Sequence, residues 1–279
     1  MKFLYHANCN DGSAAALAAW LVHGDEGNDY FPVQYGYDPP NGLEGQDVVM
    51  LDFSYPRSVI DEMRTYAKSI LIIDHHKTAE AELSKSFLPE EGKCSITCIF
   101  DMDRSGAVLA WIHFFPATVI PDLFKHIEDR DMWWFRMEGT NEIHKALQIY
   151  PDWQKWLELD SHQLRVEGTA ITRFMIQKSM QIINTPPRPK WYSYIYVPVY
   201  NLPAFMISDT LHDALEKYPE AQFAVAYFDL PDKRVYSLRS RKNGFDVSEI
   251  AKANSGGGHH SAAGFTVAIN EERWNLLPG

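Results

Sequence analysis

Short apolar runs alternate with amphipathic stretches over the first half of the chain. Four runs have the length and the Val, Ile, Leu and aromatic content of buried strands, at 2–5, 48–52, 70–74 and 98–101. The spacing of apolar residues between them predicts helices at 13–22, 57–68 and 105–115, with Ser105 as the N-cap of the last. Strands that alternate with helices in this way are typical of an α/β domain with a mostly parallel sheet.

The second half of the chain begins with a long helical pattern. Residues 153–183 have apolar positions near helical spacing and predict one or two long helices. The segment 184–190 has three prolines in seven residues, so it cannot continue a helix and forms a stiff linker. We therefore predict an N-terminal domain at 1–183 and a smaller C-terminal α/β domain at 191–279. The elements predicted in the second domain are three strands and one helix, at 194–200, 223–228, 235–240 and 209–217.

Composition narrows the class of protein. Hydrophobic residues make up 46% and charged residues 23% of the chain, which is ordinary for a globular protein. The longest apolar runs fall far short of the roughly 20 residues of a membrane span, and the first residues do not resemble a secretion signal. We expect a cytoplasmic protein with no membrane partner. The formal net charge of -11 opposes extensive binding to duplex DNA, but it suits carboxylates that are clustered around divalent cations.

Polar residues gather at the ends of the predicted strands. They are His6 and Asp11 after the first strand, Asp52 at the end of the second, and Asp74, His75 and His76 at the end of the third. In a parallel sheet, ligands bind beyond the carboxyl ends of the strands. Imidazole and carboxylate groups together are the ligands expected for manganese or a similar cation, and one carboxylate can bridge two ions. The pattern predicts a hydrolytic metal site.

The triplet Asp74-His75-His76, within Ile-Leu-Ile-Ile-Asp-His-His-Lys, resembles the motif that names the DHH phosphoesterases. The first, second and fourth motifs of that superfamily resemble residues 6–12, 48–52 and 127–131 of this chain. Residues 256–265 are similar to the signature of the DHH-associated domain found in RecJ-type exonucleases and nanoRNA-degrading oligoribonucleases. The resemblance implies a two-domain α/β fold whose active site lies in the cleft between the domains.

The resemblance also implies a set of metal ligands. Two manganese ions are expected, with magnesium or cobalt as alternatives. His6 would ligate the first ion, and Asp11, His75 and Asp129 would ligate the second. Asp52 would bridge both ions.

Two further residues of the triplet receive catalytic roles from the resemblance. Asp74 is expected to hold an imidazole in position, and His76 is expected to contact the scissile phosphate. One departure from the family pattern lies in the first motif, where the usual additional Asp is replaced by Asn8, Cys9 and Asn10. Either Cys9 or an amide oxygen takes its place, or the first ion is bound weakly.

Substrate-binding residues are predicted in the second domain. A small-residue run leads into two histidines, and its first members are Gly256, Gly257, Gly258 and His259. Backbone amides of such a run can approach a phosphate closely, and the start of a following helix would favour its charge. Arg239 and Arg241 lie two apart on a predicted strand, where their guanidinium groups can grip phosphate or a terminal carboxylate. A solvated edge strand is the alternative for these arginines.

Two tryptophans, Trp133 and Trp134, follow the fourth motif. Their rings could stack on a nucleobase, but large aromatic side chains are mostly buried for their area. We therefore expect both tryptophans to belong to the core.

The sequence as a whole predicts a metal-dependent phosphoesterase that acts, as a monomer or homodimer, on short oligonucleotides or small nucleotide phosphoesters. Cyclic dinucleotides, nucleotide bisphosphate, pyrophosphate and polyphosphate are alternative substrates. A catalytically impaired nucleotide-binding regulator is the alternative outside enzymes, because of the missing first-motif Asp. A processive DNA exonuclease would need a basic groove, which this acidic chain does not display.

Overall fold

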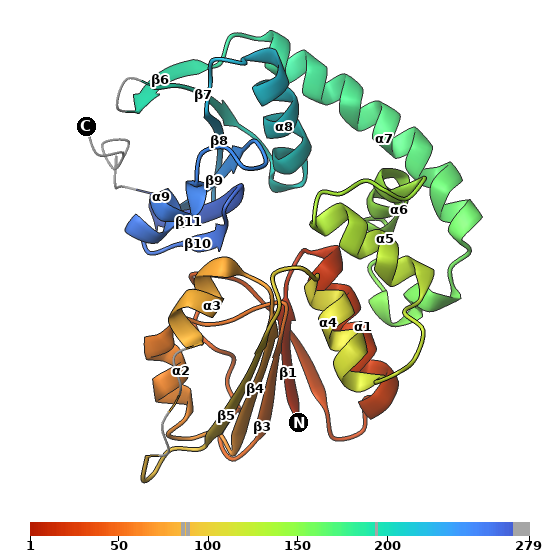
Figure 1. Ribbon diagram of the computed structural model, residues 1–279, viewed down its shortest axis with the longest axis vertical. Coiled ribbons are helices and arrows are strands. Elements are labelled where there is room, and N and C mark those ends of the chain that lie inside the picture. The colour runs from red at the N-terminus through yellow and green to blue at the C-terminus, as the bar shows by residue number, and fades with distance from the viewer. Residues whose placement is uncertain (85–86, 88–89, 193–194, 270–279) are drawn as a thin grey trace. The chain divides into compact units, whose positions relative to one another are not determined.

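The computed structural model describes residues 1–84, 87, 90–192 and 195–269, and the chain forms two compact units, Met1–Thr172 and Arg173–Gly279 (Figure 1). The first unit contains a five-stranded sheet in the order β2-β1-β3-β4-β5, with every neighbouring pair parallel. This confirms the predicted α/β class. The strands are β1 (Lys2–His6), β2 (Asp29–Val33), β3 (Asp47–Leu51), β4 (Ser69–Asp74) and β5 (Ser95–Phe100).

Helices cover both faces of this sheet (Figure 1). One layer contains α1 (Asn10–His23) and α4 (Gly106–Phe114), and the other contains α2 (Arg57–Met63) and α3 (Lys77–Leu83). Successive side chains of β1 point to opposite faces of the sheet. Phe3 packs in the core cluster with α1 and α4, and Leu4 packs in the cluster with α2 and α3. The remaining elements of this unit, on the α1 side, are α5 (Asp122–Asp131), α6 (Thr140–Leu147) and the 3-10 helix η1 (Trp153–Glu158).

Strand β2 was not predicted from the sequence. Its segment, Asp-Tyr-Phe-Pro-Val, begins with a charge and contains Pro32, which removes a backbone donor. Proline is tolerated because β2 is an edge strand that pairs only with β1.

The second unit is built on a six-stranded mixed sheet in the order β10-β11-β9-β8-β7-β6. Only β7 and β8 run parallel, and the other pairs are antiparallel. The strands are β6 (Arg188–Tyr192), β7 (Ile195–Asn201), β8 (Phe223–Asp229), β9 (Lys233–Ser240), β10 (Gly257–His259) and β11 (Ala262–Ala268). The helices are η2 (Ala204–Met206), α8 (Ile207–Lys217) and α9 (Val247–Ala253).

The two units divide within α7 (Ser161–Asn184), not at the proline-rich segment. The last turns of α7 belong to the second unit because Ile183, which is buried, packs in the same cluster as Leu202 and Leu211. The prolines do end the helix as predicted, but strand β6 starts at Arg188, inside the segment 184–190 that the sequence assigned to a linker. No helix in the part of the chain that the structure describes has the length and hydrophobicity of a bilayer span.

Candidate metal centre

The strand order of the first unit creates a natural binding position. Strand β2 pairs with one edge of β1 and β3 pairs with the other edge, so the strand order reverses at β1. Ligands of such sheets bind at this reversal, beyond the carboxyl ends of the strands. His6 ends β1, Asp52 directly follows β3, and Asp74 ends β4. Three side chains predicted from sequence therefore meet at one edge of the sheet.

Potential metal-ligating atoms lie within 4.8 Å of one another in three groups in the described part of the first unit. The groups are His6 with Cys9 and Asp52, Asp11 with Asp52 and His75, and Asp52 with Asp74 and His76. Asp52 is common to all three. This is the position that a bridging carboxylate needs.

Asp52 is buried, with 1% of its surface exposed, and neither of its carboxylate oxygens has a hydrogen-bond donor. Two imidazole nitrogens lie beside it, the Nε2 of His75, 3.1 Å from Oδ1, and the Nδ1 of His6, 3.4 Å from Oδ2. Burial raises the pKa of Asp52, but the two imidazoles outweigh it and hold the pKa well below its usual range. The backbone of Asp52 has φ 54, a left-handed conformation that is costly and is often kept at functional sites. A buried carboxylate without donors is stabilised by a cation.

The N-terminus of α4 holds Asp11 in place. The backbone N–H of Gly106 donates to Oδ2 of Asp11 at 2.7 Å, and that of Ala107 donates to Oδ1 at 3.0 Å. Burial and the nearby carboxylates of Asp52 and Asp131 nevertheless raise the pKa of Asp11 well above its usual value. A bound divalent cation would offset this clustering of negative charge.

Two glycines let the backbone approach the ligands closely. A Cβ on Gly12 would lie 2.3 Å from the carbonyl oxygen of His6, and a Cβ on Gly106 would lie 2.5 Å from the Cβ of Asp52. Gly12 is part of the first sequence motif, whereas Gly106 was not singled out from the sequence. Ser105 is the N-cap of α4, as predicted, and its side chain accepts a hydrogen bond from Val108 N. The position of Gly106 directly after this N-cap was the sequence signal that could have identified it.

The substitution Gly106→Ala is therefore expected to displace Asp52. Overpacking of this kind costs about 1–3 kcal/mol, and a shifted ligand loses roughly 10–100-fold in metal affinity. Isothermal titration with Mn²⁺ and thermal unfolding of the variant measure both effects. Ser105→Ala serves as the control on the same helix, since loss of the cap should cost about 1 kcal/mol and leave metal affinity unchanged. Unaltered metal affinity in Gly106→Ala would contradict the packing argument.

Asp74 is fully buried and holds the triplet together. Its carboxylate accepts from Ser54 Oγ at 2.6 Å and from the backbone N–H of His75 at 2.7 Å, and it lies 2.6 Å from Nδ1 of His76. Burial lowers the pKa of His76, but Asp74 outweighs it and raises that pKa above the ordinary value. The imidazole that Asp74 orients is thus that of His76.

Asp129, which the resemblance assigned to the second ion, lies elsewhere. Its oxygens accept from the backbone N–H groups of Arg136 at 2.8 Å and Met137 at 3.0 Å, and from Thr140 Oγ1 at 2.7 Å. The carboxylate that reaches the cluster is that of Asp131, with Oδ2 3.5 Å from Nε2 of His75. Residues two apart on a helix point to nearly opposite sides, so α5 can present only one of the two. Of the two aspartates, Asp131 is therefore the one that lies near His75.

Among the residues that replace the usual first-motif Asp, Cys9 brings its thiol into the cluster. Asn8 is exposed, and the amide of Asn10 donates to the carbonyl oxygen of His144 at 3.0 Å. The Sγ of Cys9 lies in one group with His6 and Asp52. Burial, followed by the charges of nearby carboxylates, raises the pKa of the Cys9 thiol well above its usual value.

An aromatic residue that the sequence did not reveal also borders the cluster. Tyr35 follows β2, and its ring centroid lies 5.6 Å from that of His6 and 5.8 Å from that of His76. Tyr35 was missed because β2 was missed, so the end of that strand could not be located.

The two tryptophans after α5 are half-buried, so the expectation that they belong to the core is not confirmed. A guanidinium group lies over each ring. The guanidinium carbon of Arg130 is 4.0 Å from the ring centroid of Trp133, and that of Arg136 is 4.6 Å from the ring centroid of Trp134. Cation–π pairs, in place of core packing, hold these side chains.

The glycine run of the second unit does not lead into a helix. Gly257–His259 forms the edge strand β10, and β11 follows it. The expected helix N-terminus is therefore absent there, and α9 precedes the run instead. Gly256 and Gly258 are needed for packing, since a Cβ would lie 2.1 Å from Gly264 O and 2.5 Å from Ala262 O, respectively.

The two arginines of the second unit do not share a strand face. Strand β9 ends at Ser240, so Arg241 lies beyond it. The guanidinium of Arg241 donates to the carbonyl oxygens of Ala221 at 2.6 Å, Tyr218 at 3.3 Å and Leu215. It caps the C-terminal end of α8 and the following turn. Arg239 donates to Ser208 Oγ at 2.9 Å.

Arg241→Ala is accordingly expected to destabilise the protein by about 2 kcal/mol, because a charged donor is lost from carbonyls that it satisfies. Urea unfolding measures this change. Lys242→Ala is the matched control, since Lys242 is the exposed neighbour and its loss should stay within about 0.5 kcal/mol. A stable Arg241→Ala variant that binds nucleotide poorly would restore the substrate role predicted from the sequence.

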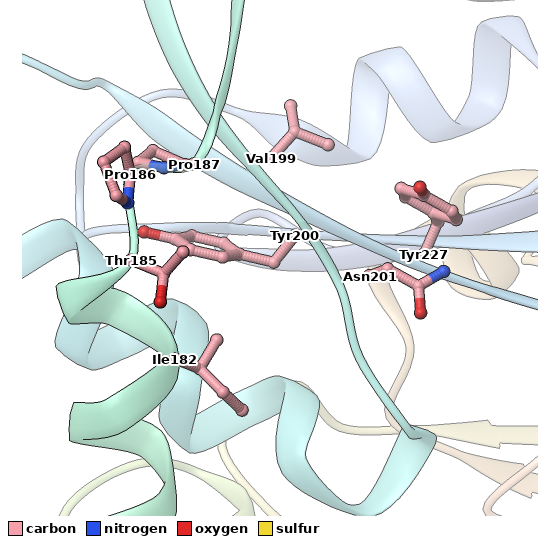
Figure 2. A pocket seen from close by; sticks show the side chains of 8 residues that line it. All are labelled: Ile182, Thr185, Pro186, Pro187, Val199, Tyr200, Asn201 and Tyr227. Carbon is pink, nitrogen blue, oxygen red and sulfur yellow. The ribbon is translucent and has the colours of Figure 1, made fainter.

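A hollow of about 320 Å³ opens in the second unit, between the end of α7 and strands β7 and β8 (Figure 2). Its lining includes the prolines after α7, and Figure 2 shows the ring of Tyr200 beside Thr185 and Pro186. None of its lining residues was predicted from the sequence to bind metal or substrate.

Comparison with known proteins bears on the class of this chain. No protein-family model matches the sequence. Two solved structures have a similar fold. One is described as the DHH domain of a member of a family of ribosomal proteins (TM-score 0.55, 14% identity, 99% of this chain and 84% of that chain). The other is RecJ from Thermus thermophilus in complex with Mn²⁺ (TM-score 0.54, 13% identity, 99% and 50%). The chain has the two-domain DHH fold.

The sequence comparison gives a nearer relative. Over 292 residues the chain is 31% identical to the uncharacterized protein R106 of Acanthamoeba polyphaga mimivirus, covering 95% of this chain and 67% of that protein. The chain belongs to the same family as R106.

Proposed function

We propose that the protein is a metal-dependent phosphoesterase that hydrolyses short oligonucleotides or small nucleotide phosphoesters. The observation that carries this proposal is the carboxylate of Asp52, buried and without hydrogen-bond donors at the centre of three groups of ligand atoms. An arrangement of this kind suits a cation better than it suits any purely structural role.

The proposed ligands divide into two sets that share Asp52. One set consists of Asp11 and His75, with Asp131 added because it lies 3.5 Å from His75, and the other consists of His6 and Cys9. Imidazole and carboxylate ligands fit manganese, which the similar RecJ structure contains. When bound, two divalent cations would activate a water molecule and offset charge on the phosphate.

The chain's own residues have separate tasks in this proposal. The carboxylate of Asp11 is held by the backbone N–H groups of Gly106 and Ala107, and the backbone N–H of Asp52 donates to Ile73 O at 2.9 Å. His76, oriented by Asp74, lies beside His6 with ring centroids 5.7 Å apart, where it can donate to a phosphate oxygen. In the second unit, Arg239 and the edge strand β10, with Gly257 and His259, remain the proposed contacts for the substrate.

A substrate panel tests the proposal. Purified protein with Mn²⁺ would be given RNA and DNA from dinucleotides to decamers, cyclic dinucleotides, nucleotide bisphosphate, pyrophosphate and polyphosphate. We expect release of mononucleotide, fastest from the shortest oligonucleotides. The Asp52→Asn variant, prepared in parallel, controls for contaminating nucleases. Absence of hydrolysis with Mn²⁺, Mg²⁺, Co²⁺ and Zn²⁺ would contradict an enzymatic role, and nucleotide binding alone would then indicate a regulator.

A further inference from the structure

The first of the two proposed ion sites contains a thiol. Cys9 is the N-cap residue of α1, and its carbonyl oxygen accepts from Ser13 N at 3.0 Å, which closes the first turn of the helix. His6 ends β1 and Asp52 follows β3, so all three residues sit at the ends of regular elements. The site is therefore built where strands and a helix of the first unit meet.

We propose that Cys9, His6 and Asp52 form a site for a thiophilic divalent cation such as zinc, cobalt(II) or ferrous iron, in preference to manganese or magnesium. This inference rests on the proposed function and specifies its metal centre. The neighbouring site, with Asp11, His75 and Asp131 as its other ligands, offers only nitrogen and oxygen. The centre would thus take two different metals, bridged by Asp52.

Distances support a shared cation in the first site. Two nitrogen or oxygen ligands about 2.0–2.1 Å from one tetrahedral zinc ion lie roughly 3.4 Å apart. Nδ1 of His6 and Oδ2 of Asp52 are 3.4 Å apart. The Sγ of Cys9 is within 4.8 Å of the ligand atoms of both.

A second observation points to a ligand independently of the cysteine. Oδ2 of Asp52, the oxygen nearest His6, is buried and has no hydrogen-bond donor. Cys9 offers its thiol beside these two residues, whereas Asn8 is exposed and the Asn10 amide nitrogen donates to His144.

The ligand chemistry then selects the metal. Thiolate ligands favour zinc and other soft cations, whereas carboxylate, carbonyl and water ligands suit magnesium and manganese. When the divalent cation binds, the Cys9 thiol loses its proton to solvent and the resulting thiolate ligates the cation. The same chain can therefore hold a thiophilic ion on one side of Asp52 and manganese on the other.

Cobalt(II) provides a direct test on the full-length, metal-free protein. Titration with Co²⁺ should produce a thiolate-to-cobalt charge-transfer band in the near ultraviolet. The band should be absent in Cys9→Ser and present in Cys98→Ser, the matched control, because Cys98 packs on β5 away from the cluster. Zn²⁺ should abolish the band, and an equal concentration of Mn²⁺ should not. Cobalt binding without the band, or a band that survives in Cys9→Ser, would overturn the proposal.

A converse variant tests the selectivity. Cys9→Asp restores an oxygen ligand, so Mn²⁺ affinity of the first site should rise at least tenfold and Zn²⁺ affinity should fall at least tenfold in competition titrations. Unchanged preference would overturn the inference.

The two proposals fail in distinguishable ways. A protein that shows the band but hydrolyses no substrate retains the thiolate site and loses the proposed function. A protein that hydrolyses nucleotides with manganese equally well as wild type and as Cys9→Ser, without the band, retains the function and loses the thiolate site.

Discussion

Replacing Asp52 with asparagine should reduce hydrolysis of every substrate more than 100-fold. Substitution of residues that merely orient metal ligands costs roughly 10–100-fold, and Asp52 is proposed to touch both ions directly. Asparagine is preferred to alanine because it tolerates the left-handed backbone of Asp52, so the loss is chemical and not conformational. Initial rates, calorimetric titration with Mn²⁺ and thermal unfolding would be measured together.

Asp103→Asn is the control for the Asp52 variant, since Asp103 is an exposed carboxylate that joins none of the three ligand groups. It should behave as wild type in all three measurements. Residual activity of Asp52→Asn above about a hundredth of wild type would remove Asp52 from the metal centre.

The pair of variants Asp131→Asn and Asp129→Asn should separate metal binding from stability. Asp131 is the carboxylate near His75, so its loss should lower Mn²⁺ affinity and activity by roughly 10–100-fold and leave the urea midpoint unchanged. Asp129 accepts hydrogen bonds from Arg136, Met137 and Thr140, so its replacement should cost about 2 kcal/mol of unfolding free energy.

Each variant of this pair is the control for the other, because they differ by two positions on one helix. The opposite outcome, with metal affinity lost in Asp129→Asn and retained in Asp131→Asn, would show that the assignment from the motif was right and that the geometry misled.

The reason for the choice between the two aspartates is visible in the packing of α5. Phe124 and Ile127 are buried against α1 and α4, and Asp131 continues their stripe at helical spacing. Asp129 is not on that face of α5, and its carboxylate accepts hydrogen bonds from Arg136 and Met137 in the loop after the helix. The motif Ile-Glu-Asp-Arg-Asp offered both residues. Asp129 is buried by its contacts with the following loop, whereas Asp131 is the aspartate near His75.

Other failures have a similar physical origin. The predicted strand 235–240 ends at the same residue as β9, so Arg241 was assigned to a strand face that lies beyond the strand end. The role of the guanidinium as a cap of α8 arises from a contact 20 to 26 residues away. Strand β2 was missed because an edge strand needs no apolar alternation and accepts a proline.

What the sequence determined by itself was the alternation of strands and helices in the first unit, and with it the place of His6, Asp52 and Asp74. Strand ends are local, since apolar runs stop where polar residues begin, and parallel strands bring those ends to one edge. Tertiary structure alone decided which aspartate of α5 lies near His75 and brought the thiol of Cys9 beside His6 and Asp52. Both depend on how helices pack on the sheet, and packing is set by contacts between residues far apart in the chain.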